Sequence, residues 1–196
     1  TWGDGVRIIG TPGGPSHFTS IAELAVYYSP ANLVSDGGFE FQLGPGLSGL
    51  WKGEGPDPKG ITRYERRGHS GVNNAWLKSG TGSWNAIVQT VPVQPHTAYL
   101  MTAWVHSNLT GPSGRFGVRS PGGASKIAEI AYGPAPGYTQ LKLNFNSDAE
   151  SIIDIYVGIW GNRTATGRER QSVRVDDISL FRITRSSKSG GTGTPR

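Results

Sequence analysis

Aromatic side chains lie at strand positions that point away from the expected core. In the stretch 152–160, isoleucine and valine alternate with other residues, so Tyr156 and Trp160 share the opposite face. This period of two predicts a strand with one buried face. The stretch 99–106 alternates in the same way and puts Trp104 opposite the core. Sugar rings stack on such indole and phenol rings, so we expect a sugar platform unless a neighbouring segment covers the rings.

Charged and polar side chains accompany these rings. Asp154 and His106 each lie two residues from a predicted platform ring and share its face, and Arg115 and Arg119 share the outer face of their own strand. Sugar hydroxyls need donors and acceptors in fixed geometry, which such groups supply. If both arginines line the groove, an anionic sugar such as a uronic acid is favoured. The alternative is a solvated face with cross-strand ion pairs.

The segment 41–60 is rich in glycine and proline and carries a lone tryptophan, Trp51. Loops of this length are uncommon unless they shape a site. We therefore place Trp51 among the ligand-contacting residues. Trp51 and Trp84 are interpreted as loop anchors or rim contacts, and Trp76 as a core residue.

Composition narrows the class of protein. The 196 residues include 30 glycines, 13 prolines and 35% hydrophobic residues, which indicates many turns between short strands and an all-β fold. Without cysteine there is neither a disulfide nor a thiolate metal site. The net charge is +5, but Lys and Arg are scattered, so we expect no nucleic-acid partner. No apolar run approaches membrane-spanning length, so we expect no membrane partner. We also expect the protein to be a monomer.

The order of segments predicts one main domain with additions at both ends. Between residues 32 and 183 about nine strands are expected, with turn signals every ten or so residues, which suggests a β-sandwich or jelly roll. Residues 1–30 carry two further strands of a separate piece, 31–185 form the sandwich, and 186–196 form a flexible linker tail. A short strand at 32–40 is expected to run into a glycine-rich turn, and the nine strands expected after it are 61–65, 75–78, 85–91, 99–106, 115–119, 127–131, 139–145, 152–160 and 173–183.

Several short motifs follow one another along the chain: Asn32-Leu-Val-Ser-Asp-Gly-Gly-Phe-Glu40, Trp51, His69-Ser-Gly71, Gln89-Thr-Val91, Tyr99-Leu-Met-Thr-Ala-Trp-Val105 and Val175-Asp-Asp-Ile-Ser-Leu180. Their order resembles that in the jelly-roll carbohydrate-binding modules of families four, nine and twenty-two, which have a galactose-binding-like fold. That resemblance implies a secreted, extracellular, bacterial module joined in the same chain to a glycoside hydrolase or polysaccharide lyase, without fixing the sugar. Residues 1–30 resemble the last strands of a discoidin-like (coagulation-factor type) domain.

The same resemblance implies a structural Ca²⁺ between the first and last strands. Calcium takes oxygen ligands from carboxylates and backbone carbonyls. Glu40 and Asp176 match the expected positions, and carbonyls near Gly38 and Ser70 complete the set. Asp36 and Asp177 are alternative ligands. Alternatively, these acids cap turns or pair with arginine.

Two other functions remain open. A glycosidase needs two opposed carboxylates, and Asp154 with Glu129 or Glu65 could supply them, but nothing singles them out. The sequence also lacks Gly-x-Ser-x-Gly, His-Glu-x-x-His and phosphate-loop motifs. We therefore expect a non-catalytic module that binds a polysaccharide. The alternative from another class is a structural or adhesive spacer of a multidomain extracellular enzyme.

Overall fold

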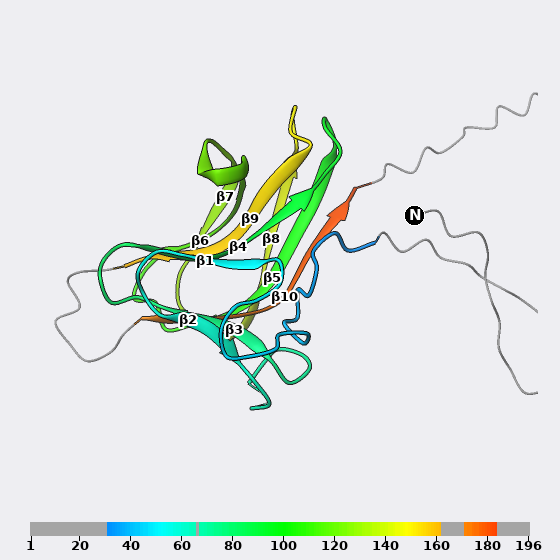
Figure 1. Ribbon diagram of the computed structural model, residues 1–196. Coiled ribbons are helices and arrows are strands. Elements are labelled where there is room, and N and C mark those ends of the chain that lie inside the picture. The colour runs from blue at the N-terminus through cyan, green and yellow to red at the C-terminus, as the bar shows by residue number, and fades with distance from the viewer. Residues whose placement is uncertain (1–30, 66, 162–170, 184–196) are drawn as a thin grey trace, which may run out of the picture.

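The computed structural model describes residues 31–65, 67–161 and 171–183. The predicted discoidin-like piece (1–30) and linker tail (186–196) lie outside these residues. The described chain is an all-β sandwich of two antiparallel five-stranded sheets, ordered β1-β4-β9-β6-β7 and β2-β3-β10-β5-β8, which Figure 1 shows as two layers. The strands are β1 (Trp51–Glu54), β2 (Lys59–Thr62), β3 (Asn74–Lys78), β4 (Trp84–Pro92), β5 (Ala98–Ser107), β6 (Gly114–Arg119), β7 (Lys126–Tyr132), β8 (Ala135–Asn146), β9 (Ile152–Trp160) and β10 (Ser172–Arg182).

The core lies between the two sheets and follows the predicted alternation. In β9, Ile153 and Ile155 are fully buried, and in β5 Met101 and Ala103 are buried from the other side. The residues between them point to the two outer faces of the sandwich. The alternation thus fixes which side chains of each strand are available to a ligand.

The segment before the first strand differs from the prediction. Residues 32–40 form turns instead of a strand. They are nevertheless tied to β10, because Leu33 N–H donates to the Leu180 carbonyl at 2.9 Å and the Asn32 side chain accepts from Leu180 N–H at 2.9 Å. Edge pairing of this kind satisfies the backbone without extending the sheet.

The predicted loop 41–60 contains two strands, β1 and part of β2, and the ligand-binding role predicted for Trp51 is wrong. Trp51 begins β1 and is only 3% exposed. Its ring packs on Phe39 with centroids 5.1 Å apart, and its Nε1–H donates to the Asp36 carbonyl at 2.9 Å. Trp51 therefore anchors the core. Glycine and proline around it hid the strand, since their composition is typical of loops.

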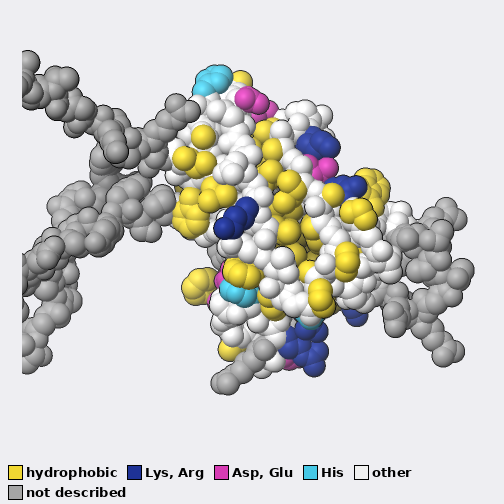
Figure 2. All heavy atoms as spheres, turned by 180° about the vertical axis from the view of Figure 1, so that it is seen from behind, with side chains coloured by type: hydrophobic (Ala, Val, Ile, Leu, Met, Phe, Trp, Pro, Cys, Tyr) yellow, Lys and Arg dark blue, Asp and Glu magenta, His cyan; other side chains and the backbone are white. Residues whose placement is uncertain are grey.

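Charge is dispersed over one face of the molecule. On the face shown in Figure 2, Lys and Arg side chains are interspersed with hydrophobic and acidic ones. Among the described residues, no helix is long and apolar enough to cross a membrane.

Candidate functional site: an aromatic cleft on one outer face

The predicted aromatic platform is divided between two faces. Trp104 lies on β5, whereas Tyr156 and Trp160 lie on β9, and these strands belong to different sheets. All three alternate with core residues and so point outward, on opposite sides of the sandwich. The expectation that they line up on one sheet was therefore wrong, because alternation tells the face of a strand but not the sheet it joins.

Trp104 is partly covered by another ring. The His69 imidazole stacks on its indole with centroids 3.8 Å apart and planes at 11°. His69 Nδ1 lies 2.7 Å from Asp177 Oδ2, which holds the imidazole in place. His106, two residues along β5, is on the same outer face, with Tyr138 edge-on at 5.8 Å. Trp104 and His106 thus belong to the β2-containing sheet.

The open aromatic surface lies on the other sheet, around Trp84 and Trp160. These residues face each other directly in the β4–β9 register, with ring centroids 5.3 Å apart. Trp160 is half exposed, at 50%. A Cβ at Gly158 would collide with the Trp84 indole, so this glycine lets the ring lie across β9. We call this site the Trp84 cleft. It has a volume of about 380 Å³ and is lined by Trp84, Arg119, Gly123, Lys126, Glu129, Tyr156 and Trp160.

Tyr156 forms the floor of the Trp84 cleft and is only 4% exposed. Its phenol lies over Gly117, where a Cβ would collide with it, and donates a hydrogen bond to Glu129 Oε2 at 2.7 Å. The Arg119 guanidinium carbon lies 5.2 Å from the ring centroid. Burial, with the hydrogen bond and negative charge of Glu129, raises the pKa of the Tyr156 phenol, which stays protonated. Tyr156 therefore supports the tryptophans and does not offer an open stacking face.

A network of ion pairs surrounds the floor. Arg119 donates a hydrogen bond to Glu54 and also pairs with Asp154, whose Oδ2 lies 3.9 Å from Arg119 Nε. Asp154 also accepts from the Thr90 hydroxyl at 2.7 Å. Glu54 accepts from Trp84 Nε1–H at 3.0 Å, which fixes the indole. Glu54 therefore both balances Arg119 and orients the Trp84 indole.

Arg115 does not line the cleft. Its guanidinium donates to the carbonyls of Pro112 and Gly114 at 2.6 and 2.8 Å and lies 3.7 Å from Glu129. In the described part of the chain, the ion pairs around the cleft join three cations with three carboxylates: Arg115, Arg119 and Lys126 with Glu54, Glu129 and Asp154. The charges of these six groups therefore cancel.

Sequence reasoning underrated Trp84. It was interpreted as a loop anchor or rim contact, yet it begins β4 and forms the wall of the cleft. A signal was present, because Ala86 and Val88 alternate with the core residue Ile87 in the same stretch. Extending that alternation back by one step puts Trp84 on the outer face.

The residues predicted to hold calcium meet at one place. Asp176 Oδ2 accepts from the N–H groups of His69 at 2.7 Å and Ser70 at 3.1 Å, and a Cβ at Gly38 would lie 3.8 Å from Asp176 Oδ1. Glu40 reaches the same loop, because its Oε1 accepts from Asn73 N–H at 3.0 Å. Asp36, in contrast, caps its own turn.

The chemistry of this group fits a hard cation. Asp176 is fully buried, and burial raises its pKa to about 6. Among the described residues, no lysine or arginine forms an ion pair with Asp176 or Glu40. Within the same part of the chain, no three acidic or histidine side chains gather closely enough to hold a metal alone. Backbone carbonyls, such as those of Gly38 and Ser70, would have to complete the shell.

Comparison with known proteins identifies the fold. No protein-family description and no curated protein sequence matches the chain. Among solved structures, the chain is similar to the carbohydrate-binding module TmCBM61 in complex with β-1,4-galactotriose, with a TM-score of 0.56 and 20% identity over 78% of this chain and 99% of that one. It is also similar to the CBM22-1 xylan-binding domain of Xyn10C from Paenibacillus barcinonensis, with a TM-score of 0.56 and 14% identity over 82% and 100% of the two chains.

A third similar structure comes from a larger protein. The enzymatically active domain of the bacteriophage CBA120 tailspike protein 4 gives a TM-score of 0.56 and 14% identity over 78% of this chain, which corresponds to 21% of that chain. At these identities the comparisons establish the fold. The described sandwich has the jelly-roll fold of carbohydrate-binding modules, as the sequence motifs predicted.

Proposed function

We propose that this chain, which has the fold of carbohydrate-binding modules, is a non-catalytic module that binds a polysaccharide in the Trp84 cleft. The observation that carries the proposal is the pair Trp84–Trp160, two outward indole rings in direct register and 5.3 Å apart. Flat C–H faces of pyranose rings stack on such surfaces. Structural neighbours that bind oligosaccharides support the ligand class.

The electrostatics of the cleft favour an uncharged sugar. Arg119 and Lys126 are each paired with a carboxylate, Glu54 and Glu129 respectively. A uronic acid would have to compete with these carboxylates for the cations. Sugar hydroxyls, in contrast, can donate to the carboxylates and accept from the cations without breaking the pairs. The paired charges thus favour a neutral glycan over the anionic one considered from the sequence.

The tilt of the two rings favours a single chain in solution. The planes of Trp84 and Trp160 meet at 48°, so they do not form one flat surface. Consecutive sugars of a twisted, soluble chain can each stack on one of the rings, whereas a crystalline polysaccharide surface matches coplanar rings. Few rings stack and the cleft stays wet, so the dissociation constant should be on the order of micromolar to millimolar.

The module would act by tethering. We propose that it is secreted and joined to a glycoside hydrolase or polysaccharide lyase, whose local substrate concentration it raises. Asp154 and Glu129, considered above as a catalytic pair, are engaged with Thr90 and Tyr156 respectively in the cleft floor. That arrangement serves to position side chains for binding.

We also propose the structural Ca²⁺. Glu40 and Asp176, with carbonyls of Gly38 and Ser70, would hold it, and it would link the segment before β1 to β10. Its charge would offset the burial of Asp176. It would stabilise the sandwich and take no part in binding the sugar.

Isothermal titration of the full chain tests the proposed function. The panel contains β-1,4-galactan, β-1,4-xylan, β-1,4-mannan and mixed-linkage β-glucan, with a polyuronate as the anionic comparison. We expect binding to at least one neutral glycan, and a loss of about tenfold or more for Trp160→Ala, since stacking and burial of a ring contribute more than about 1.4 kcal/mol. Phe41→Ala is the matched control, because Phe41 is an aromatic residue that is 82% exposed and lies outside the cleft.

Two results would contradict the proposal. If no neutral glycan of the panel binds, the proposal that the ligand is an uncharged polysaccharide is contradicted. Equal affinities for the wild type and Trp160→Ala would favour the spacer alternative or a different site. Release of reducing ends or unsaturated products by the chain would instead show an enzyme.

A further inference from the structure

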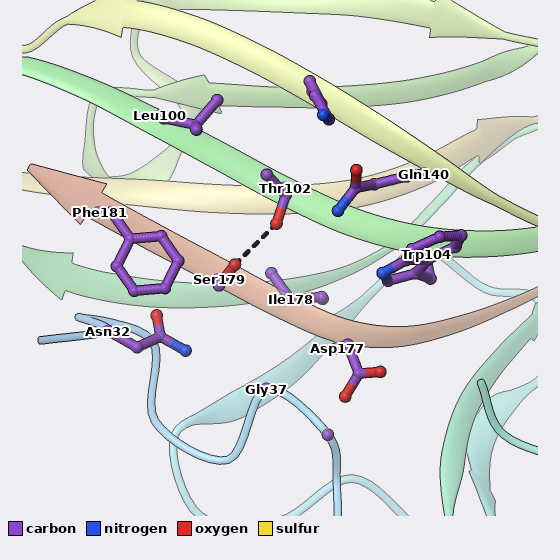
Figure 3. A pocket seen from close by; sticks show the side chains of 12 residues that line it. Asn32, Gly37, Leu100, Thr102, Trp104, Gln140, Asp177, Ile178, Ser179 and Phe181 are labelled. Carbon is purple, nitrogen blue, oxygen red and sulfur yellow. Dashed lines mark hydrogen bonds between the residues drawn. The ribbon is translucent and has the colours of Figure 1, made fainter. Parts of the chain in front are cut away.

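A second groove lies on the opposite face of the sandwich, over the β2-containing sheet. It has a volume of about 480 Å³ and crosses β8, β5 and β10. Figure 3 shows Trp104 and Gln140 at one end and Phe181 and Asn32 at the other, with Thr102 and Ser179 between them. We call it the Trp104 groove. It shares no lining residue with the Trp84 cleft.

The aromatic wall of the Trp104 groove is held rigidly. His69 stacks on the indole at 3.8 Å and is itself fixed by Asp177 at 2.7 Å. Tyr138 packs edge-on against His69 at 5.7 Å and donates to the Arg67 carbonyl at 2.8 Å. Trp104 remains partly exposed, and its uncovered part lines the groove. A ring fixed in this way loses little conformational entropy when a ligand binds.

Beside the indole lie two hydrogen-bonding side chains that have no partner among the described residues. Gln140 and Lys142 of β8 lie opposite Trp104 and Thr102 in the register of β5. Within the described ranges, neither the Gln140 amide nor the Lys142 ammonium makes a hydrogen bond or an ion pair, unlike the charged side chains of the Trp84 cleft. The amide offers both a donor and an acceptor, and the ammonium offers donors. Together with a fixed indole, these groups match the face and the hydroxyls of a sugar.

We propose that the Trp104 groove is a second glycan-binding site, which binds an uncharged sugar chain independently of the Trp84 cleft. Lys142 and Asp177 contribute one charge of each sign to its lining, so no net charge favours an ionic ligand. Because the two sites lie on opposite outer faces, one molecule could hold two polysaccharide chains. This inference extends the proposed function and takes its ligand class from it.

Titration of the full chain with hexasaccharides from the neutral panel tests the inference. The wild type should bind two ligands per chain. The double variant Trp84→Ala/Trp160→Ala should bind one ligand, in the Trp104 groove. Adding Gln140→Ala to the double variant should weaken this remaining binding several-fold, and adding Trp104→Ala should abolish it. Gln140→Ala is included because Trp104→Ala also removes the partner of the His69 ring. Phe41→Ala is the control, and melting curves verify that each variant is folded.

A second readout measures bridging directly. Long polysaccharide mixed with the wild type should give turbidity that rises with protein concentration, because each molecule joins two chains. The double variant Trp84→Ala/Trp160→Ala and the variant Gln140→Ala should each give less. Turbidity in the wild type that both variants retain in full would contradict the second site.

The outcomes separate this inference from the proposed function. One ligand per wild-type chain, lost in the double variant Trp84→Ala/Trp160→Ala, overturns the second site and leaves the Trp84 cleft intact. If the wild type binds one ligand, and only Trp104→Ala and Gln140→Ala reduce that binding, the result supports the Trp104 groove and contradicts binding in the Trp84 cleft. Absence of binding to every glycan overturns both.

Discussion

Trp84 and Trp160 face each other across the β4–β9 pair, with ring centroids 5.3 Å apart and planes at 48°. Trp84 is held by its hydrogen bond to Glu54 and lies over Gly158, whereas Trp160 is half exposed. One ring is therefore fixed and the other is open to solvent. In the proposed function, this arrangement would orient a sugar chain on one face of the sandwich.

Gly158→Ala should weaken glycan binding by displacing the Trp84 indole. The new methyl group would occupy the space in which the ring lies, and the ring would have to move. We expect a loss of about threefold to tenfold in affinity, since an aromatic contact contributes about 0.5–1.5 kcal/mol beyond its burial. Titration calorimetry measures the change. Gly46→Ala is the control, because nothing lies within 4 Å of a Cβ at that position; equal affinities for both variants would show that the ring's position is unimportant.

Arg119→Ala should destabilise the fold as well as the cleft. The side chain is 15% exposed and pairs with Glu54 and with Asp154, which is 7% exposed. Its removal leaves the buried Asp154 carboxylate, and the more exposed one of Glu54, without their cation, at a cost of about 3 kcal/mol in the free energy of unfolding. Urea denaturation measures this. Arg67→Ala breaks an exposed ion pair with Glu65 and should cost less than about 1 kcal/mol, so a similar cost for the two variants would contradict the account.

Asp57→Asn should reduce stability near neutral pH and have less effect in acid. Asp57 accepts from Gly80 N–H at 3.0 Å and Thr81 N–H at 3.2 Å, which anchors the loop before Trp84. Burial opposes ionisation, but these hydrogen bonds and Lys59 outweigh it and lower the pKa of Asp57 below its usual value. A lowered folded pKa stabilises the fold above the unfolded pKa of 3.8, and this contribution is lost as pH falls through the folded value.

The pH dependence of that variant can be followed by thermal melting. At pH 7 the loss should be about 1 kcal/mol, the difference between a charged and a neutral hydrogen-bond acceptor. It should shrink as pH is lowered below 3.8. A stability difference that stays constant between pH 7 and acid would show that the charge of Asp57 makes no contribution.

Removal of calcium should lower the melting temperature. At a free concentration about 100-fold above its dissociation constant, a bound ion stabilises the fold by about 2.7 kcal/mol, which corresponds to about 5–10 °C for a domain of this size. Differential scanning calorimetry with and without chelator measures the shift. Asp176→Asn should abolish it, whereas the exposed control Glu65→Gln should retain it. A chelator-independent melting temperature would exclude the structural ion.

Strand positions and inward faces could be predicted where hydrophobic residues alternate over many positions. The stretch 152–160 is predicted with its observed bounds. β1 and its buried Trp51 were missed, because glycine and proline dominate that segment. Alternation of hydrophobic residues predicts a strand only where it extends over enough positions.

Which residues share a face depends on the order of strands in the two sheets, and the alternation of residues within one strand does not predict that order. Tyr156, Trp160, Asp154 and Arg119 lie on one sheet, since β9 and β6 are neighbours. Trp104 and His106 fall on the opposite face because β5 pairs with β8 and β10. Pairing between strands far apart in sequence is set by the packing of the whole sandwich, so a single sequence could supply the residue types but not their grouping.

The central claim is that sugar binds beside Trp84 and Trp160, and the indole N–H signals of the six tryptophans report on it most directly. In a ¹⁵N-labelled chain titrated with a neutral hexasaccharide that binds, the Trp84 and Trp160 signals should shift in a saturable way, while that of the buried Trp51 stays in place. Signals of Trp84 and Trp160 that remain unchanged at saturating ligand would contradict the account.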